Sequence, residues 1–145
     1  MRIAIGSDHA GFALKQIVIG ILTESGHSYE DFGCYSNTSV DYPDFGRPVA
    51  EAVSQGKFDR GILICASGIG MCIVANKIAG IRAAVCHDTF SARRARAHND
   101  VNILCLGEWV IGQGLMREVV TTYLSTEFAG GRHARRVEKI RAIES

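Results

Sequence analysis

The chain has 145 residues, a length typical of one domain. Its 16 Lys and Arg residues nearly balance its 15 Asp and Glu residues, so the net charge of +1 gives no general electrostatic basis for binding nucleic acid or an anionic membrane. Hydrophobic residues make up 47% of the chain and charged residues 21%, which excludes a disordered protein.

The first half of the chain begins with a short apolar segment, residues 2–6, which predicts a strand. Apolar residues then recur with helical spacing over residues 14–22, which predicts an amphipathic helix closed by Gly26. A weaker strand is predicted at residues 29–33, and a helix around residues 45–55.

The second half alternates buried strands with helices. Residues 61–65 contain no polar residue, as expected for a strand in a parallel sheet that is covered on both faces. Two more such strands are predicted at residues 81–86 and 101–106. The remaining predicted elements are helices at 70–78, around 90–98, from Leu115 to Phe128, and at about 132–143, the last with Val137 and Ile140 facing inward.

This alternation of strands and helices predicts the fold class. Such βαβ units form a parallel sheet with helices on both faces, so we expect an α/β protein, a single-domain three-layer α/β/α sandwich of Rossmann-like type over residues 1–145. In these folds, ligands bind beyond the carboxyl ends of the strands. Chemistry is therefore expected where the predicted strands end.

The cysteines and the N-terminus indicate a compartment. The five cysteines are odd in number and no pair has C-x-x-C spacing, which favours neither a disulfide framework nor a zinc ribbon. Asp8 and His9 interrupt any apolar signal-peptide core, and the longest aliphatic run, residues 17–22, is far shorter than the roughly 20 residues of a membrane span. We therefore expect a cytoplasmic protein with reduced thiols, most of them, including Cys72, packed in the core.

The first predicted strand runs into the segment GSDHAG, residues 6–11. Ser or Asp is a good helix N-cap, which accounts for Asp8 but leaves His9 unexplained. An Asp at this position can also bind sugar hydroxyls, and a His at a helix start can contact an anion.

The strand at residues 61–65 runs into a glycine-rich turn, CASGIG, residues 65–70. The turn lacks the G-K-[ST] ending of a Walker loop and the G-x-G-x-x-G pattern of a dinucleotide site. Its backbone N–H groups lie at a predicted helix N-terminus, where they can bind phosphate or stabilise an oxyanion or enediolate. Cys65 is either a packing residue or, beside such an anion hole, a base that removes a proton next to a carbonyl.

Two later segments are ambiguous on their own. His98 and Asn99 precede the last predicted strand, but a lone histidine is more often structural, and the arginines within residues 93–96 are typical of a solvated helix face. Arg132 and Arg136 share one helix face behind a double glycine, which suits a phosphate. They are equally typical of a basic surface helix near a terminus.

Taken together, these segments resemble the ribose-5-phosphate isomerase type B family, which includes allose- and galactose-6-phosphate isomerases. The resemblance covers about residues 1–143. It is carried by IGSDHAG (5–11), DYPDFG (41–46), ILICASGIGM (62–71) with ANK (75–77), GIRAA (80–84), SAR (91–93), HND (98–100), and GGRH (130–133) with Arg136.

The resemblance implies an aldose–ketose isomerase that converts ribose 5-phosphate to ribulose 5-phosphate, in the pentose phosphate pathway. Cys65 would be the base that moves a proton between C1 and C2 through a cis-enediol(ate), and Ser67 would handle hydroxyl protons. The enediolate oxygens would be held by the backbone amides of Ala66, Ser67, Gly68, Ile69 and Gly70.

The remaining site residues are implied in the same way. Asp8 and His98 would serve the opening of the sugar ring and the binding of hydroxyls, with Tyr42 and Asn99 lining the site. The phosphate would be held by His9, Arg132 and Arg136.

The resemblance also implies how the site is assembled. Family members are metal-free, and we expect no cofactor. Their sheet is five-stranded, and their sites form between two subunits of a dimer. We therefore expect a homodimer or a dimer of dimers, in which the helix at about 132–143 carries phosphate-binding arginines. A chain with this apolar fraction and 16 glycines fits a protein that buries a subunit interface.

Three positions depart from the family pattern. Ser67 stands where threonine is common and keeps the hydroxyl, while Ala66 replaces a usual glycine, which is tolerated if its φ is negative. Trp109 stands where many members have a phosphate-binding arginine, and its indole could narrow the site. The alternatives are therefore a tetrose- or tetrulose-phosphate isomerase or a hexose-6-phosphate (allose, galactose) isomerase, and, more remotely, a non-catalytic sugar-phosphate or nucleotide binding module.

Overall fold

The apolar segments of the sequence form one sheet. The computed structural model describes residues 1–144, and its five strands all pair in parallel, in the spatial order β2-β1-β3-β5-β4. They are β1 (Arg2–Ser7), β2 (Ser28–Asp31), β3 (Arg60–Cys65), β4 (Ala83–Val85) and β5 (Ile103–Gly107). The predicted fold class and the five-stranded parallel sheet are confirmed.

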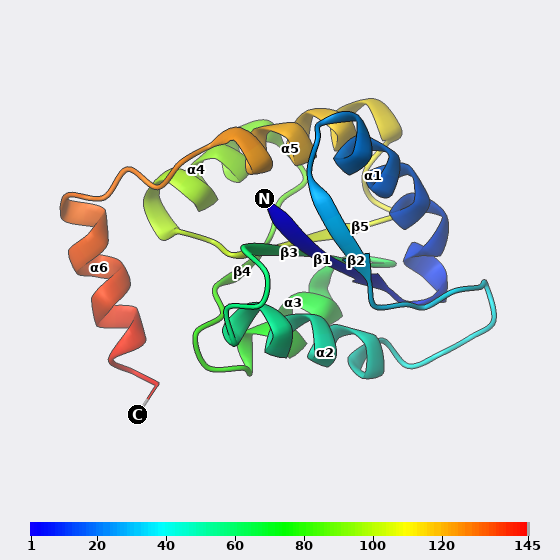
Figure 1. The fold of residues 1–145 in the computed structure, drawn as a ribbon, viewed down its shortest axis with the longest axis horizontal. Helices are drawn as coiled ribbons and strands as arrows, with labels where there is room; N and C mark the ends of the chain where they lie inside the picture. The colour runs from blue at the N-terminus through cyan, green and yellow to red at the C-terminus, as the bar shows by residue number, and fades with distance from the viewer. Residues whose placement is uncertain (145) are drawn as a thin grey trace.

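Helices cover both faces of this sheet. They are η1, a 3-10 turn (His9–Gly11), α1 (Phe12–Glu24), α2 (Tyr42–Ser54), α3 (Ile69–Asn76), α4 (Thr89–Asn99), α5 (Gln113–Ser125) and α6 (Arg132–Arg141). Helices α1, α4 and α5 lie on one face, and α2 and α3 on the other (Figure 1).

The central strand shows why residues 61–65 carry no polar side chain. Ile62 and Ile64 belong to the core cluster with α1, α4 and α5, whereas Leu63 and Cys65 belong to the cluster with α2 and α3. Successive side chains of a strand point to opposite faces, so a strand covered on both sides must be apolar at every position. The same rule explains why this segment could be identified from sequence.

Several predicted elements differ at their ends from the observed ones, three of them in the second half of the chain for clear reasons or by clear amounts. The strand expected at residues 81–86 is only β4, three half-buried residues, because it is an edge strand with a partner on one side alone. The helix expected to run to Phe128 ends at Ser125. Residues 142–143 lie beyond α6, and Ser145 lies outside the described residues.

Two side chains differ in burial from the expectation: Ile140 is exposed and Arg96 is buried. Ile140 is 43% exposed, although Val137 is buried as predicted, because α6 rests on the protein along a narrow contact only. Arg96, expected on a solvated face, is buried: its guanidinium donates to Asp100 Oδ1 and to the carbonyl oxygens of Val101 and Thr126. These acceptors lie at the end of its own helix and on the chain after α5, where no helical pattern could show them.

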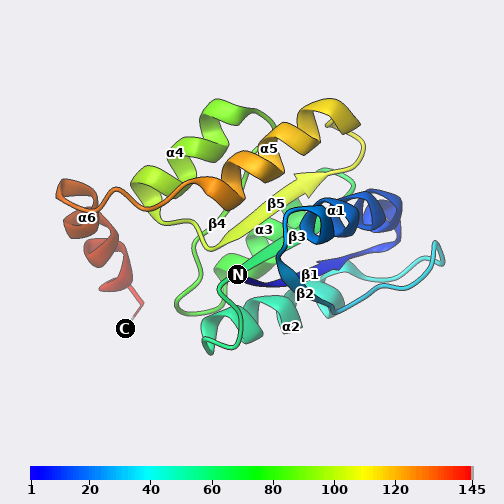
Figure 2. The same cartoon turned by 45° about the horizontal axis from the view of Figure 1, so that its top comes forward.

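Helix α6 lies apart from the two helical layers. In Figures 1 and 2 it is at one end of the molecule, beyond the ends of α4 and α5, while the junction between β1 and α1 is at the other end. Within residues 1–144, no helix is long and apolar enough to cross a membrane.

Candidate active site

Two of the predicted site segments meet at the carboxyl edge of the sheet. Strands β1 and β3 are neighbours, and Ser7 is paired with Ile64, so the residues that follow both strands emerge side by side. The backbone N–H of Asp8 donates to the carbonyl of Ile64 over 3.2 Å. Gly11 is packed so closely against that carbonyl that a Cβ would lie 2.5 Å from its oxygen. This close approach brings Asp8 and His9 to the turn at residues 65–70.

The Cys65 thiol is held by the turn that follows it. Cys65 is 4% exposed, and its Sγ accepts a hydrogen bond from the backbone N–H of Gly68 at 3.2 Å. Gly68 has a φ of +79° and is the N-cap of α3, so the sulfur lies at a helix N-terminus. Backbone N–H donors at a helix N-terminus are a typical setting for cysteines that act as bases. The geometry therefore suits a thiolate base.

The rest of the turn has the backbone conformation that the sequence requires. The hydroxyl oxygen of Ser67 accepts a hydrogen bond from the N–H of Ile69 at 3.2 Å. Among residues 1–144, Asp100 is the only non-glycine residue with positive φ, so Ala66 meets the condition set for replacing a glycine. Two of the five predicted amide donors, those of Gly68 and Ile69, thus already have partners within the turn.

The residues at and after the end of β5 bond to this turn and pack against it. The N–H groups of Glu108 and Trp109 donate to the carbonyl oxygens of Cys65 and Ala66 at 2.9 and 3.1 Å. A Cβ on Gly107 would lie 2.5 Å from the carbonyl carbon of Ser67, so only glycine fits there. The position of the turn is therefore fixed by the residues that follow β5.

Asp8 and His9 have defined partners beside the turn. Asp8 is buried, and its Oδ1 accepts the N–H of Gly11 at 3.0 Å, so it is the N-cap that one interpretation of the sequence required. His9 Nδ1 accepts the N–H of Val40 at 3.1 Å. Because that nitrogen is an acceptor, the proton of the neutral ring is on Nε2, which is then free to donate to a ligand.

Tyr42 reaches the same place from the start of α2. Its ring packs against the first turn of α3, where a Cβ on Gly70 would lie 2.7 Å from the ring carbons. The sheet edge therefore gathers the residues predicted in the first half of the chain: Asp8, His9, Tyr42, Cys65, Ala66, Ser67, Gly68, Ile69 and Gly70.

The other predicted residues lie at the opposite edge of the sheet. Helix α4 starts just after the carboxyl end of β4 and runs back for 11 residues, about 16 Å, so His98 and Asn99 in its last turn are at the amino edge. Helix α6 follows close by, because the N–H of Ala129 donates to the carbonyl of Ala97 at 3.0 Å. Within one chain, His98, Asn99, Arg132 and Arg136 are thus separated from Cys65 and His9.

His98 is nonetheless held in a defined orientation. Its ring stacks on that of His133, with centroids 4.0 Å apart and an interplanar angle of 10°. Its Nε2 is 3.1 Å from Nη1 of Arg94, and because a guanidinium only donates, Nε2 is the acceptor. The pKa of His133 is lowered by desolvation and by the positive charges of nearby arginines, among them Arg132 and Arg136. This second group is therefore a cationic surface suited to an anion.

Sequence reasoning missed two residues at the carboxyl edge. His87 follows β4, and its Nε2 accepts the N–H of Gly107 at 2.8 Å. Glu108 follows β5, and its Oε1 accepts the N–H of Leu14 at 2.6 Å, near the start of α1. Both are polar residues placed directly after a predicted strand, which is the feature that could have identified them.

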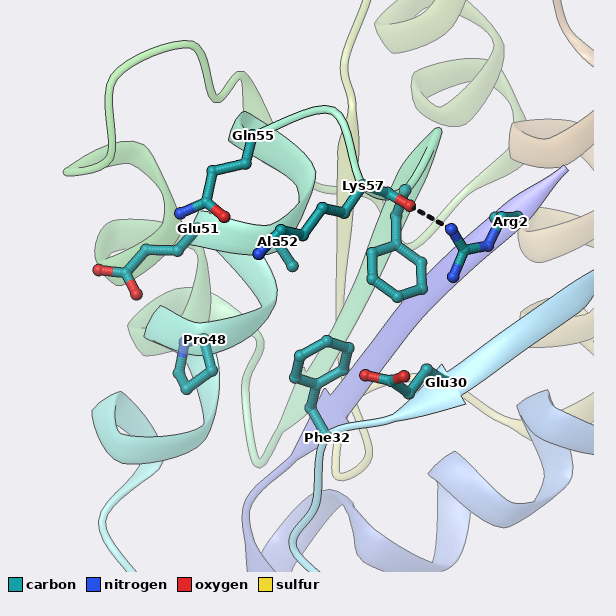
Figure 3. Close-up of a pocket in the computed structure, with 9 residues that line it drawn as sticks. Arg2, Glu30, Phe32, Pro48, Glu51, Ala52, Gln55 and Lys57 are labelled. Atoms are coloured by element: carbon teal, nitrogen blue, oxygen red, sulfur yellow. Dashed lines mark hydrogen bonds between the residues drawn. The ribbon is translucent and has the colours of Figure 1, made fainter.

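An open surface groove is found at a different place. It encloses about 450 Å³ beside β1, β2 and α2, and its lining includes Arg2, Glu30, Phe32, Glu51 and Phe58 (Figure 3). It contains none of the predicted site residues. No group of three or more His, Cys, Asp or Glu side chains within residues 1–144 is arranged to hold a metal ion.

Comparison with known proteins gives consistent results. A sequence model of the Ribose/Galactose Isomerase family matches residues 3–140. The ribose-5-phosphate isomerase B of Escherichia coli K12 is 47% identical over 99% of this chain and 96% of its own length. The D-erythrulose-4-phosphate isomerase of Pectobacterium atrosepticum is also 47% identical, over 97% of this chain and 93% of its own. The structure of a ribose-5-phosphate isomerase B from Clostridium thermocellum superposes with a TM-score of 0.97 at 56% identity, covering 99% and 97% of the two chains.

Proposed function

The chain belongs to the Ribose/Galactose Isomerase family, and on this premise we propose that it is an aldose–ketose isomerase that interconverts ribose 5-phosphate and ribulose 5-phosphate. The observation that carries the mechanism is the hydrogen bond from Gly68 N–H to Cys65 Sγ at the N-terminus of α3. It holds the Cys65 sulfur next to backbone donors, an arrangement that supports proton transfer beside a carbonyl.

The reaction moves one proton between two neighbouring carbons. In the forward direction the Cys65 thiolate removes the proton from C2 of the open-chain aldose, which leaves a cis-enediol(ate). The thiol then returns a proton to C1, and the hydroxyl of Ser67 exchanges protons between the two oxygens. The backbone amides of residues 66–70 stabilise the charge on these oxygens while it exists, so they act mainly on the transition state. The N–H groups of Gly68 and Ile69 are then shared with Cys65 Sγ and Ser67 Oγ, their partners within the turn.

The other residues bind and prepare the sugar. Asp8 and His98 open the ring and bind hydroxyls, and Tyr42 and Asn99 line the site. His9 offers its Nε2–H to the phosphate, which the free donor on this nitrogen supports. Arg132 and Arg136 supply the positive charge for that phosphate from α6.

We propose that this site is shared between two copies of the chain in a homodimer or a dimer of dimers. Cys65 and His98 lie at opposite edges of one sheet, so one chain alone cannot bring them to a single small sugar. The carboxyl edge also exposes apolar side chains that a second copy would cover, among them Ile69, Phe90 and Trp109, which are 59%, 64% and 78% exposed. A cytoplasmic location remains a prediction, supported by five free thiols.

A second substrate class is favoured by Trp109. The backbone N–H of Trp109 donates to the carbonyl of Ala66, so the residue lies beside the catalytic turn. Its exposed indole can reduce the space available for the sugar. The erythrulose-4-phosphate isomerase at 47% identity fits this alternative. Comparing kcat/KM for four-, five- and six-carbon aldose phosphates distinguishes the substrates: we expect the five-carbon sugar to lead, and a clear lead for another chain length overturns that assignment.

The thiol base is tested by Cys65→Ala. We expect kcat to fall by about a thousandfold or more, because the proton acceptor is removed while the folded structure is kept. Cys86→Ala is the matched control, since it removes a buried thiol that takes no part in the reaction, and it should keep its activity. Near-normal turnover by Cys65→Ala would exclude Cys65 as the base.

Solvent deuterium exchange tests the remote alternative of a pure binding module. An isomerase exchanges the transferred hydrogen of the sugar phosphate with solvent, whereas a protein that only binds the sugar does not. Binding with neither exchange nor formation of the ketose phosphate would refute the isomerase assignment for every sugar phosphate tested.

A further inference from the structure

His87 stands beside the catalytic turn at the point where the pairing of β4 with β5 ends. The last backbone hydrogen bond there joins the N–H of Cys86 to the carbonyl of Cys105, at 3.3 Å. Two residues further along β5, the N–H of Gly107 donates instead to Nε2 of His87, at 2.8 Å. The imidazole therefore supplies the acceptor that the short strand β4 no longer provides.

Gly107 is the residue on which the catalytic turn rests. It is paired with Cys65 in the β3–β5 register, and its Cα packs directly against the carbonyl of Ser67. Gly68 is packed as closely on the preceding residue, because a Cβ there would lie 2.9 Å from the carbonyl carbon of Leu106. A displacement of Gly107 therefore displaces the backbone donors of the turn.

His87 is kept in the form that this contact needs. Burial lowers the pKa of its imidazole, against the opposing effect of the Asp88 carboxylate. Asp88 is the N-cap of α4, where it accepts hydrogen bonds from the N–H and the hydroxyl of Ser91. On the β5 side, His87 faces the uncharged N–H of Gly107. At neutral pH the ring is therefore neutral, with its lone pair on Nε2 and its proton on Nδ1.

We propose that His87 is a positioning residue of the isomerase: its neutral imidazole fixes Gly107, and through Gly107 it aligns the turn at residues 65–70 with the enediolate. The inference rests on the proposed function, because alignment matters only if that turn stabilises a transition state. His87 needs no contact with the sugar in this role. Misalignment by a fraction of an ångström weakens transition-state binding more than substrate binding, so the effect belongs in kcat.

The proposal predicts a specific pH dependence. A proton on Nε2 replaces the acceptor by a donor that faces the N–H of Gly107, so the contact is lost when the pH falls through the lowered pKa of His87. Activity that depends on this contact is present near neutral pH and declines in the acidic range.

Two substitutions separate this role from simple packing. His87→Gln keeps an uncharged acceptor near the position of Nε2 but does not titrate, whereas His87→Leu keeps the bulk and removes the acceptor. We expect His87→Leu to lower kcat by about tenfold to a hundredfold with little change in KM. His87→Gln should stay within a few-fold of the wild type and show a weaker loss of activity as the pH falls below 6.5, the ordinary pKa of histidine. His27→Gln, at the amino edge, is the matched control and should leave the profile unchanged.

A measurement on the folded wild-type protein keeps the test independent of activity and of the folding of the variants. In a ¹⁵N-labelled sample, a scalar coupling across the N–H···N bond should connect the Gly107 amide to Nε2 of His87 and vanish on acidification. Absence of this coupling at neutral pH overturns the inference, as does wild-type kcat in His87→Leu or an equal loss in His87→Gln. If the coupling is present but the wild type isomerises no sugar phosphate, the proposed function fails while the contact stands.

Discussion

The cysteines of this chain differ in ionisation because their sulfur atoms have different partners. A hydrogen bond from the thiol of Cys105 lowers the pKa of Cys72 to about 7, with a further contribution from the Asn76 amide, 3.5 Å away. Burial raises the pKa of Cys86 to about 11 and that of Cys105 well above its usual value. The expectation that Cys72 is a core residue holds in part, since it lies half-buried at the edge of the core.

This difference predicts selective alkylation. At pH 7 a larger share of Cys72 than of the other two is thiolate, the reactive form, because the pKa values of Cys86 and Cys105 are raised. Iodoacetamide should label Cys72 before the other two, at a rate that rises between about pH 6 and pH 8 and then levels off. Peptide mass spectrometry of a time course measures this, with Cys72→Ser as the control. Equal labelling of Cys86 would contradict it.

Within α1, a buried lysine ties the helix to the segment after β2. Lys15 is fully buried, and its Nζ donates to Asp31 Oδ1 at 2.8 Å and to the carbonyl of Cys34. The same carboxylate oxygen accepts the N–H of Gly33 at 2.9 Å. The ion pair therefore anchors the start of the loop that leads to Val40, whose N–H donates to His9.

Lys15→Met should therefore destabilise the protein. The substitution keeps most of the apolar stem but leaves the Asp31 carboxylate and the Cys34 carbonyl without their cation, which costs about 3 kcal/mol of the free energy of unfolding. Urea unfolding measures the loss, and Lys77→Met, at the exposed end of α3, should change stability by less than about 0.5 kcal/mol. A Lys15→Met protein as stable as the wild type would show that the buried pair contributes nothing.

The elements themselves were largely predictable from sequence, for reasons that also explain the exceptions. The spacing of apolar residues along the chain is a property of the local sequence, so it identifies the strand at 61–65 and the helix at 14–22. Lys15 was not, although it lies between Leu14 and Val18 on the buried face, because its partners come from the loop after β2. Arg96 and Ile140 were misjudged for the same reason, since distant segments decide their burial.

At the scale of the whole molecule, the site could be predicted only in two separate halves. The rule that ligands bind at the carboxyl ends of parallel strands brings Asp8 and Cys65 together, and the structure places them there. No such rule applies to His98 or Arg132, because α4 and α6 carry them to the opposite edge, and their use in the site we propose requires a second copy of the chain. Sequence patterns describe one chain, so this half rests on the family resemblance.

Subunit complementation tests the shared site directly. Cys65→Ala damages one half of the site and Arg132→Ala the other, so each protein should be inactive alone. Random mixing by co-refolding makes half of the dimers mixed, and each mixed dimer has one site with both halves intact, so activity should return to about a quarter of the wild-type value. Mixing Cys65→Ala with Ser67→Ala is the control: both lie in the same half, so every site stays damaged and no activity returns. If each chain held a complete site of its own, neither mixture would recover activity.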